Sequence, residues 1–288
     1  YIPNMVARGL KTKKTNIIGF ILPDIMNPFY AEIAKGIEIE AREQGYSLII
    51  CDTCINLEAE VQAVELLKSK MVDGIIIGPR MFLDDEMDPD TFGTIPVILV
   101  GRIVGQYRNK NWGQVSIDER KMIQESVLQL KKAGCKKIAL ITAKESDEDE
   151  KNLRLKGFLD AMKQQKLEVL EERIVLDEYD LNTGYNGLKR LLEKKVEVDG
   201  IVCGNDLIAI GAINAARDYG ITIPKELKII GFDNIPMAEF TNPRLTTIAQ
   251  PAYQMGKAAS SMMIEYIEQK KEMEVRFFQH TYIKRETV

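Results

Sequence analysis

The chain has 288 residues, of which 45% are hydrophobic and 28% are charged, a balance typical of a soluble globular protein and not of a disordered or fibrous one. A net charge of −4 argues against a chain that grips nucleic acid along its whole length, and no apolar run is long enough to cross a bilayer. Four cysteines are too few for a disulfide framework and the N-terminus shows no signal-peptide pattern, so we expect a reducing, cytoplasmic location.

The opening residues favour a short helix that cannot persist alone. Pro3 suits the first turn of a helix, and Val6, Ala7 and Leu10 would share one face of it. Isolated helices need roughly 12 to 15 residues to be stable, so this one would form only against a partner. The one local basic cluster lies in the same segment and consists of Arg8, Lys11, Lys13 and Lys14.

From Asn16 onward, short β-branched runs alternate with amphipathic helical stretches, a pattern typical of a parallel sheet flanked by helices. Residues 17–22 predict a buried strand, and residues 29–44 predict a helix that ends at Gly45, because glycine adopts the left-handed cap without strain. The first half continues with strand 47–51, helix 58–70, strand 74–77 and strand 97–100.

The same order of elements begins again after Asp118. The predicted helices are 120–132, 153–163, 185–194 and 207–219, and the predicted strands are 137–142, 173–176, 200–203 and 227–232. The tail, residues 245–288, predicts strand, long helix and strand, and we expect it to return to both halves. The sequence therefore predicts an α/β fold with two similar doubly wound parallel-sheet lobes, joined by three crossings, whose ligand cleft faces the carboxyl ends of the strands.

Seven short motifs occur in a fixed order along nearly the whole chain. They are Tyr1-Ile2-Pro3-Asn4-x-Val6-Ala7-x-x-Leu10, Ile18-Gly19 with Pro23-Asp24-x-x-Asn27-Pro28-Phe29, Val115-x-x-Asp118, Arg154-x-x-Gly157-Phe158, Asn205-Asp206-x-x-Ala209-x-Gly211-Ala212, Gly231-Phe232-Asp233-Asn234, and Leu245-Thr246-Thr247-Ile248-x-Gln250-Pro251. Together they resemble the LacI/GalR family of bacterial transcription regulators. The chain departs from the family pattern at Cys135, where many relatives carry His, and before Arg102, where Asp is common and Gly101 stands here.

This resemblance implies an effector-binding and dimerising core with the fold of type I periplasmic binding proteins. It implies a hinge segment at residues 1–15, an N-terminal lobe at 16–117 plus 249–275, and a C-terminal lobe at 118–248 plus 276–288. In the family a helix-turn-helix headpiece that reads the major groove comes before the hinge, and this sequence holds no such headpiece. The implied partners are a small-molecule effector, operator DNA and a second copy of the chain.

In the family, the hinge segment binds the minor groove at the centre of the operator. The resemblance carries that role to Asn4, Ala7, Leu10 and Lys11, with Leu10 as an apolar wedge between base steps and Lys11 beside the phosphates. The alternative is an N-terminal tail without order in the absence of DNA, and the two interpretations are compatible.

Several polar residues follow the carboxyl ends of predicted strands, where side chains point into the cleft. Asp233 can accept two hydrogen bonds from neighbouring sugar hydroxyls, and Arg154 offers a rigid fork of donors. Asn205 supplies both a donor and an acceptor. Phe29 and Tyr30 offer an apolar wall. The predicted effector-binding residues are Asn27, Phe29, Tyr30, Arg102, Arg154, Asn205, Asp233 and Gln250.

Residues near the predicted strand ends also have structural interpretations. We expect Asp206 to cap the helix that follows it and Asp118 to be a helix cap or a residue of a crossing, and Phe29 could equally belong to the core. The pair Cys51-x-x-Cys54 has no second pair, so we interpret the cysteines as ordinary thiols. With His280 as the only histidine, we expect no metal site, no cofactor and no Ser-His-Asp hydrolase.

The leading hypothesis is a sugar-responsive repressor in which effector-driven movement of the lobes changes operator binding, and not an enzyme. The alternative is an exported sugar-binding protein of a transport system, which shares the fold but needs a signal peptide. Within regulation, a phosphorylated partner protein stays open as co-regulator. The sequence does not identify the effector.

Overall fold

The computed structural model describes residues 14–78, 89–101, 111–144 and 152–288. The chain divides into two compact units. The first comprises Tyr1–Ile117 and Pro251–Phe278, and the second comprises Asp118–Gln250 and Gln279–Val288. The chain therefore passes from one unit to the other three times. This agrees with the two lobes and three crossings that the sequence predicts.

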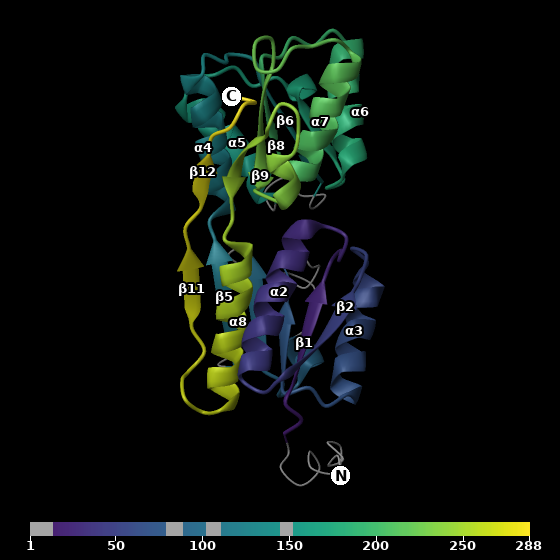
Figure 1. Cartoon of the computed structure of the whole chain (residues 1–288), viewed down its shortest axis with the longest axis vertical. Helices are drawn as coiled ribbons and strands as arrows, with labels where there is room; N and C mark the ends of the chain where they lie inside the picture. The colour runs from purple at the N-terminus through teal and green to yellow at the C-terminus, as the bar shows by residue number, and fades with distance from the viewer. Residues whose placement is uncertain (1–13, 79–88, 102–110, 145–151) are drawn as a thin grey trace. The chain divides into compact units, whose positions relative to one another are not determined.

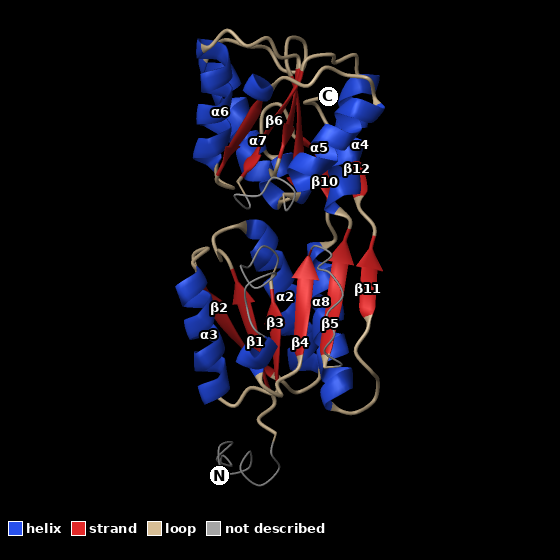
Figure 2. Cartoon of the chain, turned by 180° about the vertical axis from the view of Figure 1, so that it is seen from behind, coloured by secondary structure: helices blue, strands red, loops and turns tan. Residues whose placement is uncertain are grey.

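The first unit is built on a six-stranded parallel sheet with the strand order β11-β5-β4-β3-β1-β2 (Figure 2). Its strands are β1 (Ile17–Leu22), β2 (Ser47–Asp52), β3 (Gly74–Ile77), β4 (Val97–Gly101), β5 (Trp112–Ile117) and β11 (Val275–Phe278). Its helices are α2 (Pro28–Glu43), α3 (Leu57–Ser69) and α8 (Ala252–Ile267), with a short 3-10 helix at Pro89–Phe92.

Local sequence explains where α2 begins and ends. The side chain of Asn27 caps the helix by accepting a hydrogen bond from the N–H of Phe29, and proline occupies the first position. At the other end Gly45 has φ +79°, the left-handed conformation that glycine adopts without strain. The predicted stop at Gly45 is confirmed.

The second unit repeats this plan, with the strand order β12-β10-β9-β8-β6-β7. Its strands are β6 (Ile138–Ala143), β7 (Ile174–Asp177), β8 (Gly200–Cys203), β9 (Lys228–Asp233), β10 (Thr246–Ala249) and β12 (Thr281–Ile283), of which β12 alone runs antiparallel to its neighbour among the described strands. Its helices are α4 (Glu119–Lys132), α5 (Leu153–Gln164), α6 (Leu181–Glu193) and α7 (Asp206–Asp218), with 3-10 helices at Glu171–Arg173 and Pro236–Glu239.

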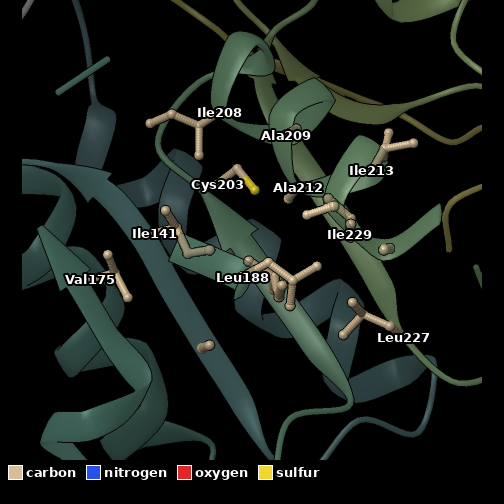
Figure 3. Close-up of a cluster of buried hydrophobic side chains, with 14 of the residues drawn as sticks. Ile141, Val175, Leu188, Cys203, Ile208, Ala209, Ala212, Ile213, Leu227 and Ile229 are labelled. Atoms are coloured by element: carbon tan, nitrogen blue, oxygen red, sulfur yellow. The ribbon is translucent and has the colours of Figure 1, made fainter. Parts of the chain in front are cut away.

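One apolar core of the second unit lies between the sheet and helices α6 and α7 (Figure 3). Ile141, Cys203 and Ile229 come from three neighbouring strands and pack with Leu188 of α6 and Ile208 of α7. All five side chains are buried. Because β6, β8 and β9 are held from one side by this core, their carboxyl ends form a fixed edge on which polar residues can be placed.

One strand is not evident from the sequence, and two others follow each other so closely that they were predicted as one. Strand β5 carries Gly113, Gln114 and Ser116, so its apolar pattern is interrupted, yet it is buried along most of its length. The tail holds two strands, β11 and β12, where one was predicted, because residues 279–280 separate them. The remaining order of strands and helices is confirmed. Among the described residues, no helix is both long and apolar enough to span a membrane.

Candidate functional site

Polar side chains gather in the second unit where the parallel strands end. Asp233 is the last residue of β9, Gln250 follows β10, and Asn205 follows β8 by two residues. Arg154 stands at the start of α5, which follows β6. All four side chains are at most 6% exposed. The structure thus places four of the predicted effector-binding residues at one edge of one sheet.

Hydrogen bonds and two aromatic rings fix the Arg154 guanidinium. Its Nε and one Nη donate to the two carboxylate oxygens of Glu119 at 3.2 and 3.3 Å, and its other Nη donates to the Gly204 carbonyl at 2.5 Å. The ring centroids of Phe232 and Tyr179 lie 4.2 and 4.7 Å from its central carbon. Glu119 therefore balances the charge of Arg154, and the two rings fix its orientation.

Asp233 occupies a strained backbone position. Its φ is +107° and that of Asn234 is +61°, both in the left-handed range that non-glycine residues seldom adopt. Gln250 donates a hydrogen bond to a carboxylate oxygen of Asp233 at 2.7 Å. Burial raises the pKa of Asp233 well above its ordinary value, although the charge of Arg154 opposes the shift.

Asp206 secures the backbone on both sides of that strained pair. It accepts hydrogen bonds from the Ile235 N–H at 2.8 Å and the Thr247 hydroxyl at 2.6 Å, and a further one from the backbone of Phe232. Asp233 and Asn234 lie between the two backbone donors. The side chain of Asp206 is fully buried, and burial raises its pKa to about 7.

The structure corrects one predicted cap and confirms another. Asn205, not Asp206, caps α7, because its side chain accepts from the Ile208 N–H at 2.8 Å, and its amide donates to the Tyr179 carbonyl at 3.2 Å. Asp206 is the first helical residue and turns toward β9 and β10 instead. Asp118 caps α4 through the Lys121 N–H, as predicted.

The described predicted residues of the first unit lie at the start of α2, which follows β1 after a short loop. Asn27 caps α2, and Phe29 and Tyr30 follow it on the first turn, with ring centroids 5.4 Å apart in an edge-to-face arrangement. Both rings are almost completely buried, at 5% and 4% exposed. A structural role in the core therefore accounts for most of their surface, and their contact with an effector stays a prediction.

Some predicted residues lie outside the part of the chain that the structure describes. These are Arg102 and the hinge residues Asn4, Ala7, Leu10 and Lys11. The four cysteines are free thiols, buried except for Cys54. Among the described residues, no group of three or more His, Cys, Asp or Glu side chains could hold a metal ion.

The partners of Arg154 are not evident from the sequence. Glu119 directly follows the capping Asp118 and resembles any acidic residue of a helix start, and Tyr179 lies in a loop without a repeating pattern. Phe232 falls within the motif Gly231-Phe232-Asp233-Asn234, but the sequence of a buried strand does not indicate that its aromatic residue stacks on a cation. Only the three-dimensional arrangement identifies these contacts.

Taken together, the second unit presents a guanidinium, a carboxyl group and two amides at one edge of its sheet, with two aromatic rings packed on the guanidinium. The polar groups can form directed hydrogen bonds to hydroxyls. Nothing in this set resembles a nucleophile activated by a general base, since the described residues at this edge include no serine or cysteine beside a histidine.

Comparison with known proteins places this arrangement in a family. Residues 15–286 match the family of periplasmic binding proteins and the sugar binding domain of the LacI family. The transcriptional regulator RegA of Clostridium saccharobutylicum, of helix-turn-helix type, is 34% identical over 290 residues, which cover all of this chain and 86% of RegA.

Two solved structures show the same fold. A periplasmic binding protein/LacI transcriptional regulator from Alkaliphilus metalliredigens, complexed with D-xylulofuranose, is 30% identical with a TM-score of 0.78, and the match covers 95% of this chain and 99% of that one. The lac repressor dimer bound to operator and an anti-inducer has a TM-score of 0.86 at 21% identity, with 100% of this chain and 99% of that one covered. The sugar-binding family model matches residues 15–286, a regulator is similar over the whole chain, and the chain forms two six-stranded lobes. The chain therefore belongs to the LacI family of transcription regulators and comprises their effector-binding core.

Proposed function

We propose that this chain binds an uncharged sugar or sugar derivative at the strand ends of its second unit and, as a homodimer, couples that binding to its affinity for operator DNA. The observation that carries the proposal is the buried set of Arg154, Asp233, Asn205 and Gln250, held rigidly beside two aromatic rings. Sites for small polar ligands combine apolar surface with a few fixed hydrogen-bonding groups in this way.

The charges of this set favour an uncharged ligand. Glu119 already balances Arg154, and Asp206 and Asp233 are two further buried carboxyl groups. A phosphorylated sugar would place its negative charge where Arg154 is already balanced by Glu119 and where burial disfavours even the ionised form of Asp233. A hydroxyl group adds no charge and can both accept from Arg154 and donate to Asp233.

A binding screen tests this proposal. The purified chain is heated with D-ribose, D-xylulose, D-glucose, cellobiose and glucose 6-phosphate, and binding is read as a rise in melting temperature. A ligand at 100 times its Kd adds about 2.7 kcal/mol to the free energy of unfolding. We expect an uncharged sugar to stabilise the protein and glucose 6-phosphate to have no effect.

The variant Asp233→Ala is expected to lose that stabilisation. Asp218→Ala, which removes a half-exposed aspartate of the same unit, serves as the matched control and should retain it. If Asp233→Ala bound the sugar as tightly as the unmodified chain, the assignment of the site would be wrong. Stabilisation by glucose 6-phosphate alone would overturn the preference for an uncharged ligand.

The partners and location follow from the same proposal. An operator-binding regulator acts in the cytoplasm, where the DNA lies, and works without enzymatic activity. The hinge residues Asn4, Ala7, Leu10 and Lys11 are proposed to contact the operator. An exported transport protein is disfavoured, because the relative that matches the whole chain at 34% identity is a transcriptional regulator.

A further inference from the structure

Figure 1 shows the chain after β12 running to its C-terminal end within the second unit. Hydrogen bonds hold this C-terminal segment, residues 284–288, against the starts of β9 and β10. The buried Thr287 hydroxyl donates to the Ile229 carbonyl at 2.6 Å and accepts from the Thr246 N–H at 2.9 Å. The Ile229 N–H donates to the Thr287 carbonyl at 3.1 Å. The segment is therefore fixed to the two strands that lead to the candidate site.

Arg285 reaches from this segment to the connection between β9 and β10, residues 234–245. Its side chain is only 10% exposed. One terminal nitrogen donates to the Leu245 carbonyl at 2.8 Å, and the other donates to the Asn234 side-chain oxygen at 2.8 Å and to the Glu239 carboxylate at 3.0 Å. Arg285 therefore contacts the connection at its first residue, at its last residue and in the middle.

Asn234 is the residue of this connection that most needs an outside contact. Its φ of +61° follows the +107° of Asp233, and two such non-glycine conformations in a row persist only where their surroundings enforce them. Asp206 accepts from the Ile235 N–H directly after the pair at 2.8 Å. Asp206 thus restrains the neighbouring backbone, whereas Arg285 restrains a side chain of the pair itself.

The orientation of Asp233 depends on the conformation of Asn234. Gln250 contacts Asp233 twice, because its backbone N–H donates to the Asp233 carbonyl at 3.3 Å and its side-chain amide donates to the carboxyl group at 2.7 Å. That carbonyl belongs to the planar peptide group that joins Asp233 to Asn234. A change of backbone conformation at Asn234 would therefore turn the carbonyl away from Gln250 and disturb the carboxyl group with it.

We propose that Arg285 is a positioning residue of the effector site: by holding Asn234 in its left-handed conformation, it keeps the Asp233 carboxyl group oriented toward Gln250 and ready to bind a sugar hydroxyl. Arg285 acts through Asn234 and not by touching the sugar. This inference rests on the proposed function for the sugar, whereas the effect of Arg285 on Asp233 is measurable in the sugar-free chain.

Two measurements on the whole chain without sugar test this role. Arg285→Met keeps an apolar stem and removes all donors of the guanidinium. We expect the Ile235 amide, which donates to Asp206, to exchange with solvent about tenfold faster. We also expect the Asp233 carboxyl group, followed by carbon-13 NMR, to titrate about one pH unit lower, because burial raises its pKa less once it leaves Gln250. Loss of a nearby cation alone would shift this titration in the opposite direction.

Arg244→Gln is the matched control. Arg244 belongs to the same connection and pairs with Glu286 of the same C-terminal segment at 2.9 Å, so the substitution removes an arginine contact to that segment and leaves Arg285 in place. We expect both the exchange of Ile235 and the titration of Asp233 to match those of the parent chain.

A second variant, Asn234→Gly, decides the question even if Arg285→Met does not fold. It keeps Arg285 and removes the acceptor through which Arg285 acts, and glycine adopts the left-handed conformation without strain. We expect the exchange of Ile235 to rise as in Arg285→Met, with no further rise in the double variant. Unchanged exchange and titration in Asn234→Gly would overturn the proposal.

The effect on binding is then measured by titrating D-ribose, D-xylulose, D-glucose and cellobiose into each variant. For a sugar that binds the parent chain, we expect about tenfold weaker binding to Asn234→Gly and unchanged binding to Arg244→Gln. Unchanged affinity in Asn234→Gly would show that Arg285 does not position the effector site. If none of these sugars bound the parent chain, the proposed function would fail, while exchange and titration would still decide whether Arg285 positions Asp233.

Discussion

Replacing Asp206 with asparagine should change how the stability of the protein depends on pH. The Asp206 side chain is fully buried, and burial raises its pKa to about 7, while an aspartate in the unfolded chain titrates near its model value of 3.8. Between these two values the folded protein keeps a proton on Asp206 that the unfolded chain has released. The unfolded state is therefore favoured progressively as the pH rises through this interval.

The magnitude follows from linkage. Each pKa unit corresponds to about 1.4 kcal/mol, so a raised pKa of about 7 removes roughly 4 kcal/mol from the free energy of unfolding between pH 4 and pH 7, after which the loss levels off. The amide introduced by Asp206→Asn cannot ionise, so the variant lacks this loss. It also provides one acceptor oxygen fewer, because its nitrogen cannot accept from Ile235 or Thr247, which costs about 1 to 3 kcal/mol at every pH.

Urea unfolding at pH 5, 6, 7 and 8 measures the difference. We expect the wild-type free energy of unfolding to fall relative to that of Asp206→Asn by about 2 to 3 kcal/mol from pH 5 to pH 7, and to change little above pH 7. Asp118→Asn is an instructive control, because hydrogen bonds from Lys121 outweigh the effect of burial and lower the pKa of Asp118, so that its contribution is lost as the pH falls. Parallel curves for wild type and Asp206→Asn would refute the buried-proton argument.

Three further substitutions probe packing and charge. Arg154→Met should lower the free energy of unfolding by about 3 to 5 kcal/mol in urea, because it removes the cation that balances the buried Glu119 carboxylate; a loss below 1 kcal/mol would mean that water reaches the pair. Gly211→Ala places a Cβ atom 2.0 Å from the Leu181 carbonyl and should cost about 1 to 3 kcal/mol in the same assay, unless α6 and α7 can move apart. Leu67→Ala should cost about 2 to 5 kcal/mol, followed by the fluorescence of Trp112, which packs against the same core; an unshifted midpoint would contradict that packing.

The fold was predictable wherever the apolar periodicity agrees with the residues that begin or end a helix or strand. Strand β1 is an unbroken apolar run, and α2 has a proline at its first position and a glycine directly after its C-cap, so local sequence alone defines both elements. Strand β5 fails this test, because Gln114 and Ser116 occupy positions that only the tertiary packing buries. Strand formation there depends on pairing with β4 on one side and, on the other, with β11, which is distant in the sequence and weakly patterned.

The clustering of the candidate-site side chains was predictable, and the contacts between them were not. Residues that follow the ends of parallel strands must gather at one edge, which is why Arg154, Asn205, Asp233 and Gln250 were identified together. The exchange of roles between Asn205 and Asp206 was not predictable, since both residue types cap helices equally well. It depends on the close approach of β9, where Gly231 leaves room for the Asp206 carboxylate.

Polar contacts of the two units differ in how much they contribute to stability. In the second unit, buried ionisable groups hold one another, and breaking such a contact costs several kcal/mol. In the first unit, Lys14 and Glu268 are each about one-third exposed, and an ion pair of that kind contributes only about 0.2 to 1 kcal/mol. The groups at the strand ends of the second unit therefore contribute to the stability of the fold as well as to the candidate site, whereas the Lys14–Glu268 pair contributes little to it.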